Sequence, residues 1–157
     1  MSLEKEGKAL VFKKGGETLR IEAWGKNALR VRSTMQREFT GLDWALTEKP
    51  EESDPEIKFF EVEYSGDGFG AIKNTHASIA NGRVKAEISY AGILSFYRDD
   101  KLVLREYYRS YGGTLSKESR CLKTINREWK GVIGGTGHSL SLKFESNDGE
   151  KIFGIGQ

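Results

Sequence analysis

Cysteine is almost absent from this chain of 157 residues, which contains only Cys121. A single cysteine excludes an internal disulfide and gives no indication of an oxidising compartment. We expect Cys121 to be a small, partly buried hydrophobic residue rather than a catalytic thiol. The first eight residues carry acids where a secretory signal needs bases followed by an apolar stretch. We therefore expect a cytoplasmic protein.

Long apolar stretches are lacking too. No run approaches the roughly 18 consecutive apolar residues of a membrane span, so no membrane partner is expected. Proline occurs only twice, whereas glycine occurs 19 times, which is typical of a turn-rich β protein. The length suits one domain, residues 1–157, with a core of its own.

Motifs for metal binding and catalysis are also missing. His76 and His138 are 62 residues apart, and neither lies in a ligand-spaced cluster with acids or cysteine. We therefore expect no metal and no cofactor, and we interpret both histidines as surface or strand-end residues. No G-x-S-x-G pattern marks a nucleophile. Residues 65–70 are rich in glycine but precede a β-type pattern, which favours a turn over a phosphate-binding loop.

Glu106 is the acid with the most apolar surroundings in the sequence. An apolar setting can raise the pKa of a carboxyl group and suit it to catalysis. The simpler interpretation is a strand-end residue that pairs with Arg105 or Arg109 across a sheet. The residues themselves therefore predict a β-protein without an active site of its own.

Alternation of apolar and polar residues dominates the chain. In residues 18–24, Leu19 and Ile21 alternate with charged side chains, which is the pattern of a half-buried strand. The pair Asn81-Gly82 is a strong hairpin signal. Strands are predicted at residues 8–13, 18–24, 28–34, 57–64, 77–80, 83–89, 93–98, 102–107 and 139–145. Counting weaker segments gives about nine to eleven strands, enough for an all-β, antiparallel β-sandwich.

Two segments interrupt this alternation. Residues 35–56 are predicted to form a long loop with one helical turn, under which Trp44 and Leu46 pack. Loops of this length in compact domains usually have a function or cover a neighbour. Residues 119–129 fit an irregular strand and a short helix equally well.

Charge is distributed unevenly along the chain. Residues 38–67 hold ten acids and two bases, whereas residues 98–130 hold nine bases and five acids. Acids interrupt the basic segment throughout, which argues against nucleic-acid binding. A solvated sheet face, one that meets another domain, is the better interpretation.

The chain ends on an unusual stretch. Leu140, Leu142 and Phe144 fall on one side of a predicted half-buried strand. A turn at residues 147–149 leads into the apolar, glycine-rich residues 152–156. A natural domain rarely stops one residue after such a run, so we expect the sequence to be part of a longer protein.

Three segments together resemble glycoside hydrolase family 31, the α-glucosidase and α-xylosidase family. Residues 150–157, EKIFGIGQ, resemble the signature E-x-x-Y-G-L-G-E/Q that ends its N-terminal domain. Phe153 stands where tyrosine is commoner, and Gln157 is similar to the α-xylosidase-type variant. Residues 19–32 resemble the opening pair of strands of the family. Residues 92–106 resemble its hairpin G-x-L-x-F…G-K-x-L-L-x-E.

The resemblance implies an N-terminal β-sandwich of the galactose-mutarotase-like kind, packed on a (β/α)₈ barrel in the same protein. That barrel would hold an aspartate nucleophile and an aspartate acid/base, and retaining enzymes need these carboxyl groups about 5–5.5 Å apart. Both would follow Gln157, so no catalytic residue is expected in this chain. The residues expected near a carbohydrate substrate are Phe153, Gly154, Gly156 and Gln157. Alternatively, the two glycines only permit close backbone packing at a domain junction.

Two other functions remain open from the sequence. A free-standing carbohydrate-binding module would use exposed aromatic residues, for which the candidates are Trp24, Trp44, Tyr107, Tyr108 and Tyr111. A mutarotase-like epimerase would need a histidine and an acid placed over a sugar. His76 and His138 lie in no recognisable motif for that chemistry.

Overall fold

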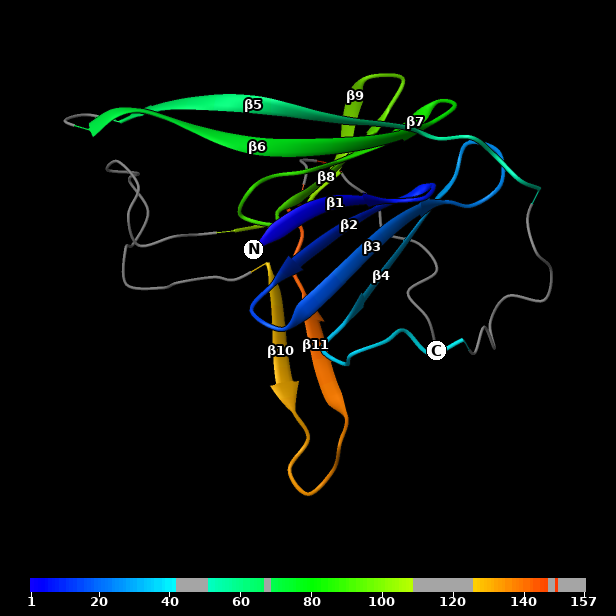
Figure 1. The fold of residues 1–157 in the computed structure, drawn as a ribbon, viewed down its shortest axis with the longest axis vertical. Helices are drawn as coiled ribbons and strands as arrows, with labels where there is room; N and C mark the ends of the chain where they lie inside the picture. The colour runs from blue at the N-terminus through cyan, green and yellow to red at the C-terminus, as the bar shows by residue number, and fades with distance from the viewer. Residues whose placement is uncertain (42–50, 67–68, 109–125, 147–148, 150–157) are drawn as a thin grey trace.

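The computed structural model describes residues 1–41, 51–66, 69–108, 126–146 and 149 (Figure 1). Every regular element within these residues is a β-strand, and every strand pairing is antiparallel. No helix in this part of the chain is long and apolar enough to cross a bilayer. The expected all-β fold is confirmed.

The first sheet has four strands in the order of the chain. They are β1 (Ser2–Glu6), β2 (Ala9–Lys14), β3 (Glu17–Ala23) and β4 (Leu29–Thr34). In β3 the alternation has its expected effect, because Leu19 and Ile21 are buried while the charged residues between them stay partly exposed. The sequence did not indicate β1, whose acids lie along the edge of the sheet beside Lys13 of β2.

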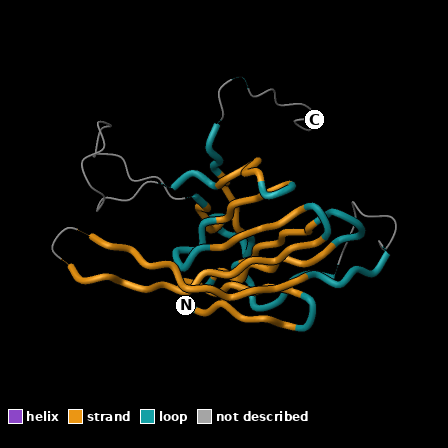
Figure 2. The backbone as a smooth tube through the Cα atoms, turned by 90° about the horizontal axis from the view of Figure 1, so that it is seen from above, coloured by secondary structure: helices purple, strands orange, loops and turns teal. Residues whose placement is uncertain are grey.

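The second sheet has five strands, again in chain order. They are β5 (Glu56–Gly66), β6 (Phe69–Asn81), β7 (Val84–Ile88), β8 (Leu94–Arg98) and β9 (Lys101–Arg105). Tight turns join β6 to β7 and β8 to β9, as expected: Gly82 has φ +61°, and Asp99 and Asp100 have φ of 51° and 59°. The β5–β6 pair is the longest hairpin and extends past the other strands, as Figure 2 shows.

The core lies between these two sheets. The four-stranded sheet contributes β2 and β3 side chains, and the five-stranded sheet contributes β6, β7 and β8 side chains. The core residues are Leu10, Phe12, Leu19, Ile21, Ala77, Ile79, Ala86, Ile88 and Leu94. Full burial of a leucine, isoleucine or phenylalanine side chain contributes about 1.5–3 kcal/mol, so this layer is the main stabilising feature of the sandwich.

Two turns connect the sheets at one end of the sandwich. Asn81 donates from its side-chain amide to the carbonyl oxygens of Gly25 and Ala28, at 2.7 and 2.8 Å. In return, the Asn27 side chain accepts a hydrogen bond of 2.8 Å from the backbone N–H of Arg83. The turn at residues 25–28 is thereby held against the Asn81-Gly82 turn.

A third element is the hairpin of β10 (Arg127–Gly131) and β11 (His138–Leu142), which projects from the sandwich in Figure 1. After β11 the chain returns to the edge of the five-stranded sheet. There the backbone N–H of Tyr107 donates to the carbonyl of Lys143, and the backbone N–H of Glu145 donates to the carbonyl of Arg105, both at 2.8 Å. Residues 127–129, the end of the segment that fitted a strand and a helix equally well, lie in strand β10.

Strand β11 differs from its expected half-buried state. Leu140 and Leu142 are 37% and 49% exposed, and Phe144 just beyond the strand is 42% exposed. The alternation is present, but among the described strands β11 pairs only with β10, outside the sandwich, and no described sheet covers its apolar side. An exposed apolar surface of this kind commonly marks an interaction site.

Candidate functional site

The four residues expected near a sugar, Phe153, Gly154, Gly156 and Gln157, lie outside the described residues. Their placement beside a substrate stays a prediction. Cys121, Trp44 and Leu46 also lie outside the described residues. Of the loop expected at residues 35–56, only residues 35–41 and 51–56 are described, so the helical turn expected within it stays a prediction. In the described part of the chain, no three histidine, cysteine or acidic side chains are grouped to hold a metal ion.

The aromatic residues proposed for a binding module do not share one surface. Trp24 lies beyond β3, with the guanidinium of Arg30 4.4 Å from its ring centroid. Tyr108 lies after β9, on the other sheet, and lines a different depression. Trp44 and Tyr111 lie outside the described residues. The described members of the set therefore form no single sugar-binding platform.

The two histidines were expected to be surface or strand-end residues, and His138 does lie at a strand end. His138 is the first residue of β11, and its ring meets the Trp129 ring edge-on with centroids 6.3 Å apart. His76 lies in β6, and its Nε2 is 3.0 Å from the hydroxyl of Tyr64. His76 is half-buried in the interior of its strand and lines a cavity, so its interpretation as a surface or strand-end residue is wrong.

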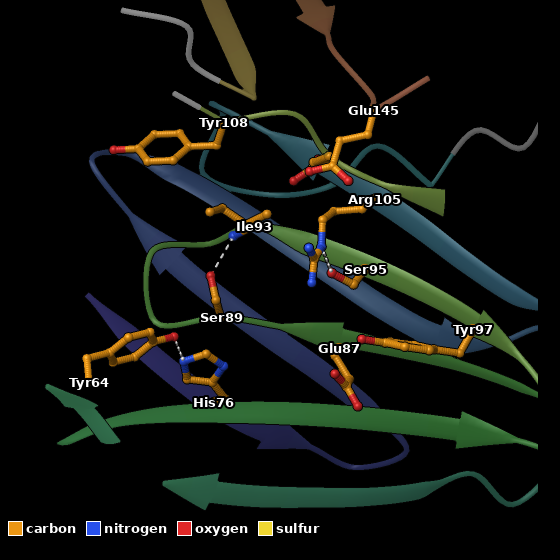
Figure 3. A pocket seen from close by; sticks show the side chains of 11 residues that line it. Tyr64, His76, Glu87, Ser89, Ile93, Ser95, Tyr97, Arg105, Tyr108 and Glu145 are labelled. Carbon is orange, nitrogen blue, oxygen red and sulfur yellow. Dashed lines mark hydrogen bonds between the residues drawn. The ribbon is translucent and has the colours of Figure 1, made fainter. Parts of the chain in front are cut away.

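That cavity has a volume of about 320 Å³ and lies on the face of the five-stranded sheet that points away from the core (Figure 3). Strand pairing explains its composition, because residues that alternate with the core positions come together on the opposite face. The lining residues are Tyr64, His76, Glu87, Ser89, Ile93, Ser95, Tyr97, Arg105, Glu106, Tyr108 and Glu145.

Aromatic rings surround His76 at one end of this cavity. The ring centroids of Phe60, Tyr64 and Tyr90 lie 5.8, 6.0 and 6.2 Å from that of His76. Burial lowers the pKa of His76, and the nearby Glu87 carboxylate only partly opposes this shift. The imidazole is therefore neutral at pH 7 and has one N–H donor and one nitrogen acceptor.

The other end of the cavity combines charged and hydroxyl groups. Glu87 forms an ion pair with Lys85 at 3.2 Å, and the Lys85 ammonium lies 4.6 Å from the Tyr97 ring centroid. Burial, followed by the Glu87 charge, raises the pKa of Tyr97, so its phenol stays protonated. Arg105 donates to the Ser95 hydroxyl oxygen at 3.2 Å. The cavity thus presents fixed donors and acceptors to a small polar molecule.

A buried charge cluster lies on the core side of the same sheet edge. Glu106 is 2% exposed and accepts from Arg127 at 2.6 Å, from Asn126 at 2.6 Å and from the backbone N–H of Leu94 at 2.9 Å. The strand-end position of Glu106 is confirmed, but its expected pairing with Arg105 is wrong. Arg105 points to the outer face, while Glu106, the next residue, points inward.

Arg127 joins this cluster to the four-stranded sheet. Its Nε donates to Glu17 of β3 at 2.7 Å, and its Nη2 donates to the carbonyl of Gly92 at 2.7 Å. Glu17 also accepts from the hydroxyl of Ser33 at 2.6 Å and from the indole N–H of Trp129 at 3.3 Å. One arginine therefore connects both sheets and the β10–β11 hairpin.

The Glu17 side of this cluster predicts a loss of stability in acid. Burial raises the pKa of Glu17, but hydrogen bonds from Arg127 and Ser33 outweigh it and hold the pKa below its usual value of about 4.5. Folding therefore favours the ionised form, and the stability that Glu17 contributes is complete above pH 4.5 and disappears as the pH falls through the lowered pKa. Urea denaturation between pH 7 and pH 2.5 measures this decline.

The variant Glu17→Gln is the control for this prediction. It removes the titrating group but keeps the shape of the side chain, so its unfolding midpoint should be lower at pH 7 and fall less steeply below pH 4.5. Parallel pH profiles for the two proteins would contradict the assignment.

Two known proteins are similar to this chain over most of its length. No family model matches the chain. An uncharacterized family 31 glucosidase, ORF2, of Pseudescherichia vulneris is 34% identical in an alignment over 151 residues that covers 90% of this chain. A solved family 31 α-xylosidase from a soil metagenome, in complex with xylose, superposes on 95% of this chain with a TM-score of 0.75 and 31% identity. Over nearly its whole length the chain is therefore similar to one part of two glycoside hydrolase family 31 proteins.

The chain corresponds to a small part of each of these proteins. It spans 26% of the length of the glucosidase and 21% of the α-xylosidase chain. The all-β sandwich seen here is therefore the fold of one portion of a larger enzyme type. The expected family resemblance is confirmed.

Sequence reasoning missed most of the cavity and of the charge cluster. Ser95, Tyr97 and Glu87 carried a signal only as the polar members of alternating strands. Their convergence depends on the register between β7 and β8, which the sequence does not state. Arg127 lay in the ambiguous segment and gave no sign of a partner 110 residues earlier.

Proposed function

We propose that this chain is the non-catalytic N-terminal domain of a retaining α-glycosidase, an α-glucosidase or α-xylosidase that hydrolyses O-glycosyl bonds. One observation carries the proposal: the match to the solved α-xylosidase covers nearly all of this chain but about a fifth of that enzyme. The domain supports a catalytic (β/α)₈ barrel in the same protein and borders its sugar pocket through residues 153–157. The carbohydrate substrate binds the parent enzyme.

The exposed apolar side of the β10–β11 hairpin is a second argument that another domain packs against this one. Leu140, Leu142 and Phe144 line an apolar depression together with Val31 and Phe96 of the two sheets. Ile133 at the hairpin tip is fully exposed. A surface of this kind is stabilised when another domain covers it, and the barrel of the parent enzyme is the occupant that we propose.

The cluster around Arg127 suits a supporting role. It fixes the base of the hairpin to both sheets through side chains that are nearly buried, with 5% exposure for Arg127 and 1% for Glu106. A charge network with every partner satisfied holds elements in one arrangement. The hairpin is thereby held at a defined angle for the domain that packs on it.

The proposal predicts that the isolated chain does not hydrolyse aryl α-glucosides or aryl α-xylosides. The reaction needs two carboxyl groups about 5–5.5 Å apart around the scissile bond, and we assign both to the barrel. The full-length gene product should release the aryl group from one of these substrates. Release of the chromophore is followed with both proteins at equal concentration, and a cooperative urea transition verifies that the isolated chain is folded. Turnover by the isolated chain would overturn the proposal.

A further inference from the structure

Apart from Glu106, which belongs to the Arg127 cluster, the residues that line the cavity over the five-stranded sheet have no part in the supporting role proposed above. The cavity volume of about 320 Å³ is at the lower end of the range for small-molecule sites. We propose that this cavity binds a saccharide, either one neutral pyranose or a short chain of such rings. The inference goes beyond the proposed function, because supporting a barrel requires no ligand on this face.

Aromatic side chains at the margins suit the apolar faces of a sugar ring. In Figure 3, Tyr64, Tyr97 and Tyr108 stand at three sides of the cavity, and the polar groups lie between them. Tyr64 and Tyr108 are 44% and 39% exposed, so both rings are accessible. An amphipathic ring system of this kind offers a π-face to C–H groups and a hydroxyl group at the same time.

The polar groups between the tyrosines match alternating hydroxyl groups. The hydroxyl oxygen of Ser89 accepts from the backbone N–H of Ile93 at 3.0 Å, and that of Ser95 accepts from Arg105. Each of these serines still has a proton to donate, while Glu87 and Glu145 are acceptors. Neutral His76, in contact with the Tyr64 hydroxyl, adds a donor or an acceptor. A polyhydroxylated ligand is the class that uses both kinds of group at close spacing.

The charges of the lining favour a neutral ligand over an ion. Glu87 and Glu145 disfavour phosphates and carboxylates, because like charges repel in a partly desolvated site. The guanidinium of Arg105 lies between them and disfavours a cation. Glu106 is neutralised by Arg127 on the other side of the sheet edge. Hydrogen bonds from a neutral hydroxyl group to these charged side chains are the strong ones.

Titration of the 157-residue chain with glucose, xylose and maltose, followed by nitrogen-resolved NMR, tests the proposal. We expect saturable shifts in the His76 imidazole and in the amides of β6, β7 and β8, with a Kd of about 1 mM, which is typical of a small, solvent-accessible site. Glycerol is the control ligand, because it has hydroxyl groups but no ring. The proposal would be overturned if these positions showed no shifts at a sugar concentration a hundredfold above this Kd, or if glycerol caused equal shifts.

Two variants locate the site. Glu87→Gln keeps the shape of the side chain but removes charged hydrogen bonds, and Tyr108→Ala removes one aromatic wall; each should raise Kd at least about tenfold. Phe59→Ala is the matched control, since Phe59 is 44% exposed but lies on the opposite face of β5 from Phe60. Its Kd should equal that of the unmodified chain. Equal affinity in all three variants would overturn the assignment of the cavity.

The two tests fail in distinguishable ways. A sugar-binding chain without hydrolytic activity supports both proposals. Loss of the binding result alone leaves the supporting role intact, because that role is measured by the activity of the full-length and isolated proteins.

Discussion

Replacing Arg127 by methionine is expected to lower the free energy of unfolding by about 3–5 kcal/mol. The guanidinium lies between two carboxylates, Glu106 and Glu17, whose side chains are 1% and 13% exposed. Methionine fills similar space but leaves Glu106 buried without its cation, and the carbonyl of Gly92 loses a donor. Urea denaturation followed by tryptophan fluorescence measures the loss.

A surface cation provides the matched control for Arg127. Lys13 also pairs with two acids, Glu4 and Glu6, but its side chain is 45% exposed. Solvent screens such pairs, so Lys13→Met should leave the urea midpoint nearly unchanged. Combining Arg127→Met with Glu106→Leu should restore part of the lost stability, since no unpaired buried carboxylate then remains at that position. If Arg127→Met and Lys13→Met behaved alike, the buried cluster would not have the role assigned to it.

Gly92→Ala is expected to have the second large effect, a loss of about 2–5 kcal/mol. Gly92 has φ +87°, a conformation that L-residues adopt with strain. An added Cβ would also lie 2.6 Å from the Phe12 ring and 3.3 Å from Nη2 of Arg127. The methyl group must therefore displace a core aromatic ring and one arm of the charge cluster. Thermal and urea unfolding of the two proteins measure the difference.

Gly7→Ala separates the strain of the backbone from the clash with Phe12. Gly7 has φ +60° and no atom within 4 Å of an added Cβ. This variant should lose only the conformational part, about 1–2 kcal/mol. Equal losses at Gly7 and Gly92 would mean that Phe12 and Arg127 accommodate the methyl group freely.

The strands that could be predicted from the sequence are those whose signal is local. Leu19 and Ile21 alternate with charged residues, and they are buried in β3 as that alternation requires. The Asn81-Gly82 pair turns the chain because glycine takes a positive φ without steric conflict. Both features depend only on residues that are neighbours in the chain, so a single sequence is sufficient to find them.

The features that could not be predicted depend on partners far apart in the chain. β1 contains three charged residues in Ser2–Glu6, and only pairing with β2 makes it a strand. Glu106 carried a local hint in its apolar neighbours, but Asn126 and Arg127 gave none. The cavity requires the register of the five strands β5 to β9 and the return of residues 143–145 to the sheet edge. Alternation sets which face a side chain takes but not which side chains meet there.

The contact between Glu17 and Arg127 also bears on when the protein can fold during its synthesis. The two residues are 110 positions apart, so at roughly 5–20 residues per second the ribosome adds them about 6–22 s apart. All four strands of the first sheet leave the ribosome during that interval. Packing them against the second sheet then would partly bury Glu17 before its cation exists. We therefore expect the nascent sandwich to stay open until the β10 segment emerges, which makes one late arginine the closing step of biosynthetic folding.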